Sequence, residues 1–168
     1  MATKKTSDSD TKQGTTPQTL AKQIDDQRKA TAQLVGAQLW LPDVVQHDYP
    51  AAANYLSLIA DPKTVSDMVA DLKKAPIEMH RANDILRAAG LDLLPLGDPS
   101  VKRDLAKVMT GRRWSPVLVV RGDVLRGYPL TVADGYHRIC ASFHLSEDTY
   151  IPCKIADPIR QRVGIRRP

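Results

Sequence analysis

The chain has 168 residues, of which 42% are hydrophobic and 26% charged, a composition typical of one ordinary globular domain. Its 24 Lys and Arg exceed its 19 Asp and Glu, and the resulting formal charge of +5 favours anionic partners such as nucleotides or nucleic acids. The two cysteines form no CxxC pair, which argues against a disulfide framework or a zinc site and fits a reducing compartment. No apolar run follows the N-terminal lysines or is long enough to span a membrane, so we expect a cytoplasmic protein without a membrane partner.

Both ends of the chain are predicted to be tails. Residues 1–30 are mostly Thr, Ser, Asp, Lys and Gln, with almost nothing to bury. Ordering them would cost backbone entropy without return, so we predict a disordered tail there. Residues 159–168 are predicted to form a basic C-terminal tail, and folded structure is expected to begin near Leu34.

A helical segment is predicted between residues 34 and 90. Apolar residues at helical spacing predict helices over 51–59, over 65–75 and over 78–89, the last ending at a glycine. This pattern indicates that each helix buries one apolar face, but it does not indicate what the helices pack against. We expect them to pack on or extend the domain, or to join two copies of the chain through residues 51–89.

The predicted core of the domain spans residues 91–158 and begins with an apolar run. Leu91–Leu96 contains a proline, which predicts an edge strand or another extended segment. Asp98 followed by Pro99 predicts a helix start, because aspartate caps free amides and proline suits the first helical position. The buried face of this helix is expected to consist of Val101, Leu105, Val108 and Met109.

Strands and a further helix complete the predicted core. Residues 116–120 form a continuous apolar run typical of a buried strand. Two glycines then allow a hairpin return to a partner strand over 130–133, followed by a helix over about 135–144 and a strand over 150–155. The sequence therefore predicts an α+β fold, a small mixed sheet with packed helices.

The junction between the second strand and the last helix predicts an anion-binding turn. Gly135 allows close approach of a ligand, and the helix start offers unpaired amides and a partial positive charge. His137 and Arg138 add side-chain donors on the first turn, and Asp134 can hold a magnesium ion or take a proton from a substrate hydroxyl. A structural interpretation stays open, in which Arg138 pairs with Asp134 and the turn binds nothing.

The order of these features over residues 91–156 resembles the ParB and sulfiredoxin superfamily. The resemblance rests on the helix before Pro116–Val119, the strand that leads into a Gly-x-x-Arg turn, and the IPCKI run at 151–155. It implies a ParB/sulfiredoxin-like fold that binds the phosphates of ATP, ADP or CTP, with Mg²⁺, through three residues of the turn: Gly135, His137 and Arg138.

Departures from the family narrow what the resemblance implies. Tyr136 stands where sulfiredoxins carry their reactive cysteine, and we interpret Cys140 and Cys153 as small core residues, so sulfiredoxin chemistry is not expected. Partition ParB proteins continue into a helix-turn-helix, whereas this chain ends soon after the last strand, so DNA segregation is not expected. The Asp-Gly-x-x-Arg form is similar to ParB-fold free-serine kinases, whose catalytic acids correspond in position to Asp134 and Asp98.

Two functions therefore stay open. The first is a magnesium-dependent phosphotransferase or nucleotide hydrolase, with Asp134 and Asp98 catalytic and the turn holding phosphate. The second is a non-catalytic regulatory or interaction module for a nucleotide, a DNA backbone or a protein partner. Asp98 is also explained as a helix cap, and Trp114 as a core residue beside solvated arginines rather than a nucleic-acid contact.

Overall fold

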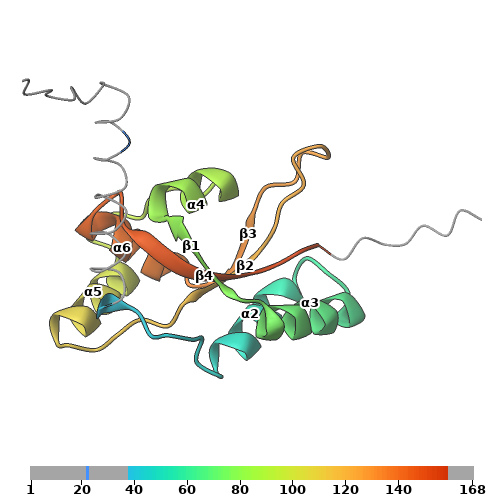
Figure 1. Ribbon diagram of the computed structural model, residues 1–168, viewed down its shortest axis with the longest axis horizontal. Coiled ribbons are helices and arrows are strands. Elements are labelled where there is room, and N and C mark those ends of the chain that lie inside the picture. The colour runs from blue at the N-terminus through green and yellow to red at the C-terminus, as the bar shows by residue number, and fades with distance from the viewer. Residues whose placement is uncertain (1–21, 23–37, 159–168) are drawn as a thin grey trace, which may run out of the picture.

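The computed structural model describes residues 38–158 and Lys22, and it contains five helices and one four-stranded mixed sheet in that part of the chain (Figure 1). The predicted α+β class is confirmed. Apart from Lys22, the expected tails and the expected start near Leu34 lie outside the described residues. In the described part, no helix has the length and apolar character needed to cross a membrane.

The sheet has the strand order β1-β4-β2-β3. β1 (Ile77–Arg81) pairs antiparallel with β4 (Tyr150–Ala156), and β4 pairs parallel with β2 (Val117–Val120). β2 also pairs antiparallel with β3 (Thr131–Asp134). The predicted strands over 116–120, 130–133 and 150–155 are thus present, and the hairpin that joins β2 to β3 projects beyond the sheet (Figure 1).

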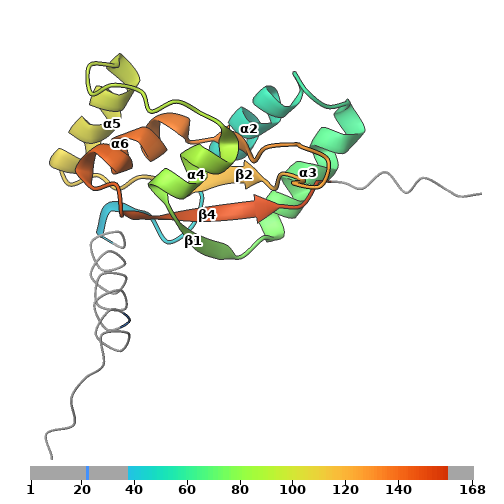
Figure 2. The same cartoon turned by 90° about the horizontal axis from the view of Figure 1, so that it is seen from above.

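Helices pack on both faces of the sheet. α2 (Asp48–Leu56) and α3 (Pro62–Lys74) share one hydrophobic core with one face of the strands. α4 (Ala82–Ala89), α5 (Pro99–Met109) and α6 (Tyr136–Leu145) form the other core with the opposite face. Figure 2 shows these three helices gathered over the same side of β4.

The central strand β2 supplies side chains to both cores. Leu118 and Val120 belong to the core under α2 and α3, whereas Val117 and Val119 belong to the core under α4, α5 and α6. This division follows from the strand geometry, in which successive side chains point to opposite faces. The continuous apolar run that predicted a buried strand is explained by burial on both sides.

Trp114, just before β2, closes one end of the core. It is 1% exposed, and its ring meets that of Trp40 edge-on at a centroid distance of 5.1 Å. Its indole Nε1–H donates to the carbonyl oxygen of Asp104 in α5 at 2.9 Å. The interpretation of Trp114 as a core residue is confirmed.

The helix predicted over 78–89 is instead a strand followed by a helix. Residues 77–81 form β1, and α4 begins at Ala82. The strand sequence IEMHR carries charges and no buried apolar alternation, and it lies at the sheet edge, held by its pairing with β4. The 34–90 segment is therefore not wholly helical, since it contributes one strand to the sheet.

Two further expectations about the core are met only in part. Of the two alternatives for the 91–96 segment, the edge strand is wrong, because the segment pairs with no strand. It contacts α6 instead: the Tyr136 hydroxyl donates to the carbonyl of Asp92, and the His144 ring contacts the carbonyl of Leu94. Met109 is 85% exposed because it is the last residue of α5 and turns away from the face that buries Val101.

Candidate functional site

The predicted turn forms between β3 and α6. β3 ends at Asp134, Gly135 adopts a φ of 103°, and α6 begins at Tyr136. A Cβ on Gly135 would lie 2.5 Å from Val117 Cγ1 and 3.1 Å from Arg138 Nη2. The left-handed backbone and the lack of space both require glycine here. One consequence is that the Arg138 guanidinium can fold back over the turn.

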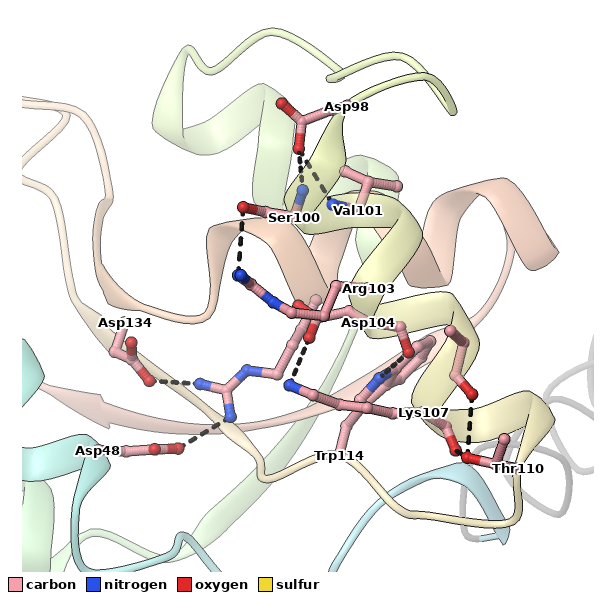
Figure 3. Close-up of polar contacts among 12 residues, drawn as sticks. Asp48, Asp98, Ser100, Val101, Arg103, Asp104, Lys107, Thr110, Trp114 and Asp134 are labelled. Atoms are coloured by element: carbon pink, nitrogen blue, oxygen red, sulfur yellow. Dashed lines mark hydrogen bonds and ion pairs between the residues drawn. The ribbon is translucent and has the colours of Figure 1, made fainter.

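Arg138 is buried against two carboxylates. Its side chain is 12% exposed, and its Nη1 donates to Asp48 Oδ2 at 2.8 Å while its Nη2 donates to Asp134. Figure 3 shows the carboxylates of Asp48 and Asp134 directed at this same guanidinium. We call Asp48, Asp134 and Arg138 the Arg138 cluster. The ion pair of Arg138 with Asp134, which the sequence left open, is present.

Asp48 is a member of the site that sequence reasoning missed. It is the first residue of α2, its side chain is 7% exposed, and it lies 90 residues before Arg138 in the chain. Nothing in its local sequence separates it from a solvent-exposed acid at a helix start, where aspartate is common. Only the burial of Asp48 next to Arg138 marks it as part of the site. This burial is a tertiary contact that the sequence alone does not show.

The Arg138 cluster is negative overall when both carboxylates are ionised. Burial raises the pKa of Asp134 above its ordinary value of 3.8, Arg138 opposes this rise, and the nearby charge of Asp48 adds to it. The exposed ring of His47 lies beside Asp48, with 3.0 Å between Nε2 and Oδ1. An anion that approaches Arg138 therefore meets two carboxylates already in place.

The first turn of α6 has no capping side chain. Its N-cap is Gly135. α2 and α4 likewise have no side-chain cap, whereas α3 and α5 have their first amides satisfied by the carboxylates of Asp61 and Asp98. The first four amides of a helix have no partner within the helix, and together with the helix dipole they attract an anion. α6 thus presents donors at the place where the sequence predicted an anion-binding turn.

Asp98 caps α5, as its position before Pro99 predicted. Its Oδ1 accepts hydrogen bonds from the amides of Ser100 at 2.8 Å and Val101 at 3.0 Å. The amide of Val101 is the main cause that holds the pKa of Asp98 below its ordinary value, and the charges of His137 and Arg103 contribute. Asp98 and His137 are therefore near one another, so α5 borders the first turn of α6.

Arg103 is a second residue that sequence reasoning missed. It projects from α5, and its Nη2 donates to Ser100 Oγ at 3.2 Å (Figure 3). In residues 38–158 it has no carboxylate partner, in contrast to Arg138. Its charge contributes to the lowered pKa of Asp98, so it lies near the start of α5.

A dedicated metal site is not formed by the described residues. Within residues 38–158, no three His, Cys, Asp or Glu side chains gather where they could hold a metal ion. Magnesium bound with a nucleotide needs only one or two carboxylates, because the phosphates supply other ligands. Asp134 is the carboxylate directly before the turn, and its ion pair with Arg138 is made through Oδ2.

The two cysteines and a surface cleft beside the β2–β3 hairpin lie apart from the Arg138 cluster. Cys140 and Cys153 are fully buried and unpaired, and burial raises the pKa of both thiols, so the prediction that they are core residues is confirmed. A cleft of about 740 Å³ opens between α2 and the β2–β3 hairpin. It is lined by Thr131 at the start of β3, and neither Asp134 nor α6 reaches it.

No family model, no curated protein and no solved structure matches the chain. The resemblance to the ParB and sulfiredoxin superfamily therefore rests on the residues and their order alone.

Proposed function

We propose that this domain binds the phosphate groups of a nucleotide, ATP, ADP or CTP, at the first turn of α6. The observation that carries the proposal is the uncapped start of this helix, where Gly135 replaces the capping carboxylate found on α3 and α5. Open amides at a helix start are the ordinary protein group for phosphate. The resemblance to the ParB and sulfiredoxin superfamily and the net charge of +5 agree with an anionic ligand.

The side chains beside the turn are assigned to the same ligand. His137 lies on the first turn and adds a donor from the side of α5. Arg138 has a planar fork suited to phosphate oxygens, but it exchanges a carboxylate for the phosphate because both ends of its guanidinium are occupied. In this scheme the ligand phosphate replaces a carboxylate in an ion pair with Arg138. It does not bind to a guanidinium that was free before.

We extend the proposal to phosphoryl transfer or nucleotide hydrolysis with magnesium. Asp134 ends β3 directly before the turn, and its raised pKa brings it closer to the range in which a carboxylate accepts a proton from a hydroxyl or water. Asp98 is the weaker candidate for a second acid, because one of its oxygens already accepts two amide hydrogen bonds.

A second function, binding without turnover, is favoured by one observation. Asp134 is 24% exposed and ion-paired with Arg138, so it is not free to act as a base in this arrangement. Under this alternative the domain serves as a cytoplasmic regulatory or interaction module that holds a nucleotide or a DNA backbone. Loss of DNA retention with rising salt would support the nucleic-acid form, and no retention at low salt would remove it.

Thermal unfolding with ATP, ADP, CTP and GTP in the presence of magnesium tests the binding proposal. A ligand at about 100 times its Kd stabilises the folded state by about 2.7 kcal/mol. Calorimetry of Arg138→Ala should show lost affinity, whereas Arg87→Ala, which removes an exposed arginine on α4, should keep it. A folded wild type that responds to none of the four nucleotides would overturn the proposal.

Phosphate release separates the enzyme from the binding module. If Asp134 is the base, Asp134→Asn should abolish phosphate release while the variant still shows a thermal shift with nucleotide. Nucleotide binding without any phosphate release in the wild type, with hydroxyl acceptors such as serine supplied, would favour the module.

We also propose that copies of the chain associate through the 51–89 region. The end of α2 is followed by two exposed apolar residues, Leu58 at 80% and Ile59 at 60%. Light scattering of the wild type and of Leu58→Glu tests this proposal. A monomeric wild type would overturn it without bearing on the nucleotide site.

A further inference from the structure

Asp48 occupies Nη1 of Arg138, one of the donors that the proposed function assigns to a phosphate. We infer that Asp48 is an internal competitor of the ligand, so that its carboxylate leaves Arg138 when an anion binds and returns when the anion leaves. α2, which the family resemblance does not reach, would then regulate the nucleotide site. The inference rests on the proposed function, and it adds a residue and a mechanism that the sequence did not predict.

The burial of the Arg138 cluster explains why exchange is needed. The Arg138 side chain is 12% exposed, and the carboxylate that meets its Nη1 belongs to a side chain that is 7% exposed. On the other side, Nη2 contacts Asp134 and lies 3.1 Å from the position of a Cβ on Gly135. An anion therefore has no free approach to the guanidinium while both carboxylates are in place.

Asp48 rather than Asp134 is the carboxylate able to leave. Asp134 ends β3 and Arg138 lies on the first turn of α6, so their backbones stay close whatever happens to α2. Asp48 comes from a separate helix and sits at its first position, preceded by an N-cap, His47, that makes no side-chain capping hydrogen bond. Tyr49, Ala52 and Leu56 hold the backbone of α2 in the core, so the exchange is assigned to rotation of the Asp48 side chain alone.

Charge also favours this direction of exchange. Removing one negative charge beside a cation strengthens its attraction for an anion, and the effect is large where solvent screens poorly. On the side away from Arg138, the Asp48 carboxylate contacts the exposed His47 ring, with 3.0 Å between Oδ1 and Nε2.

Asp48→Asn is the direct test, with titration of ATP and magnesium by calorimetry as the readout. We expect affinity about tenfold higher than in the wild type, within the range usual for coupling between two groups on one site. Asp67→Asn is the matched control: it makes the same change of charge on the exposed face of α3 and should leave affinity unchanged. Unchanged or weaker binding by a folded Asp48→Asn would overturn the inference.

A double substitution shows whether the gain passes through Arg138. In the Arg138→Gln background, Asp48→Asn should no longer raise affinity. A gain that persists there would mean that Asp48 acts by general electrostatics, and the competitor mechanism would be wrong.

The wild type supplies a test that does not depend on the folding of a variant. With saturating ATP and magnesium, the NMR signal of the Asp48 carboxyl carbon should shift as this group leaves Arg138, while the carboxyl carbon of Asp67 on α3 serves as an internal reference. An unchanged Asp48 signal at saturation would overturn the inference. If neither the wild type nor a folded Asp48→Asn binds ATP, ADP or CTP, the proposed function itself fails; binding by Asp48→Asn alone would support the competitor.

Discussion

The side chain of Val117 occupies the space into which any side chain on Gly135 would project. Val117 Cγ1 lies 2.5 Å from the position of a Cβ there, and Gly135 also has a φ of 103°. Val117 is fully buried at the start of β2, so it has no room to move aside. The glycine that predicted a phosphate-binding turn is therefore also required by the packing of the sheet against α6.

Gly135→Ala is expected to destabilise the protein without any ligand, by roughly 3 kcal/mol, because it adds both overpacking and backbone strain. Urea denaturation measures this change. The matched control is Gly127→Ala: Gly127 has a similar positive φ of 75°, but nothing lies within 4 Å of its Cβ position. That variant should lose only about 1 kcal/mol. Equal losses at the two sites would show that the contact with Val117 is not as close as described.

Arg138 is expected to matter more for stability than either of its carboxylate partners. Arg138→Gln leaves Asp48 and Asp134 buried beside each other without a cation, at a cost of about 3 kcal/mol. Asp134→Asn leaves the pair of Arg138 with Asp48 in place and should cost about 1 kcal/mol or less. Chemical denaturation of the two variants gives the comparison. A larger loss in Asp134→Asn would mean that Asp48 contributes little to holding the guanidinium.

The pH dependence of Asp134 has a definite sign. Its pKa is raised in the folded state, chiefly by burial, so its contribution to stability is present below the ordinary aspartate value of 3.8 and is lost as the pH rises through the raised value. Asp134→Asn does not titrate. The stability of this variant relative to the wild type should therefore increase between about pH 4 and about pH 7. A relative decrease over this range would place the folded pKa below the ordinary value.

Local signals in the sequence predicted most of the elements correctly. The caps and proline at the start of α5, the apolar run of β2 and the strand-glycine-helix order at Gly135 are each set by neighbouring residues. The turn of the candidate site therefore follows from the sequence. The tertiary contacts of Asp48 and Arg138 beside the turn do not follow from the local sequence.

Tertiary contacts account for what the sequence did not predict. β1 has only a short apolar alternation, Ile77 and Met79, with neither residue fully buried, and it is held by pairing with the edge of β4. Helical spacing therefore favoured the wrong element there. Asp48 reaches Arg138 only because α2 packs against the end of β3. Neither contact can be recognised from the residue pattern of a single segment. Both depend on which helices and strands pack together in the folded chain.

Substitutions of Asp98 can distinguish its role as a helix cap from a role as a catalytic acid. Asp98→Ala should lower Tm by a few degrees, since two amides of α5 lose their acceptor, and Asp98→Ser should restore most of the loss because serine also caps. The lowered pKa of Asp98 means that its contribution is present above 3.8 and is lost as the pH falls through the lowered value. The serine variant should not show this loss.

The serine variant then separates the two roles in activity. If Asp98 is only a cap, Asp98→Ser should keep nucleotide binding and any phosphate release of the wild type; a catalytic carboxylate would lose turnover while Tm stays near the wild-type value. Asp61→Ser is the matched control, because Asp61 caps α3 with the same pair of amide contacts. Since Asp98 already accepts two backbone hydrogen bonds and lies beside His137, we expect Asp98 to act as a cap alone, so that turnover survives in Asp98→Ser and is lost in Asp134→Asn.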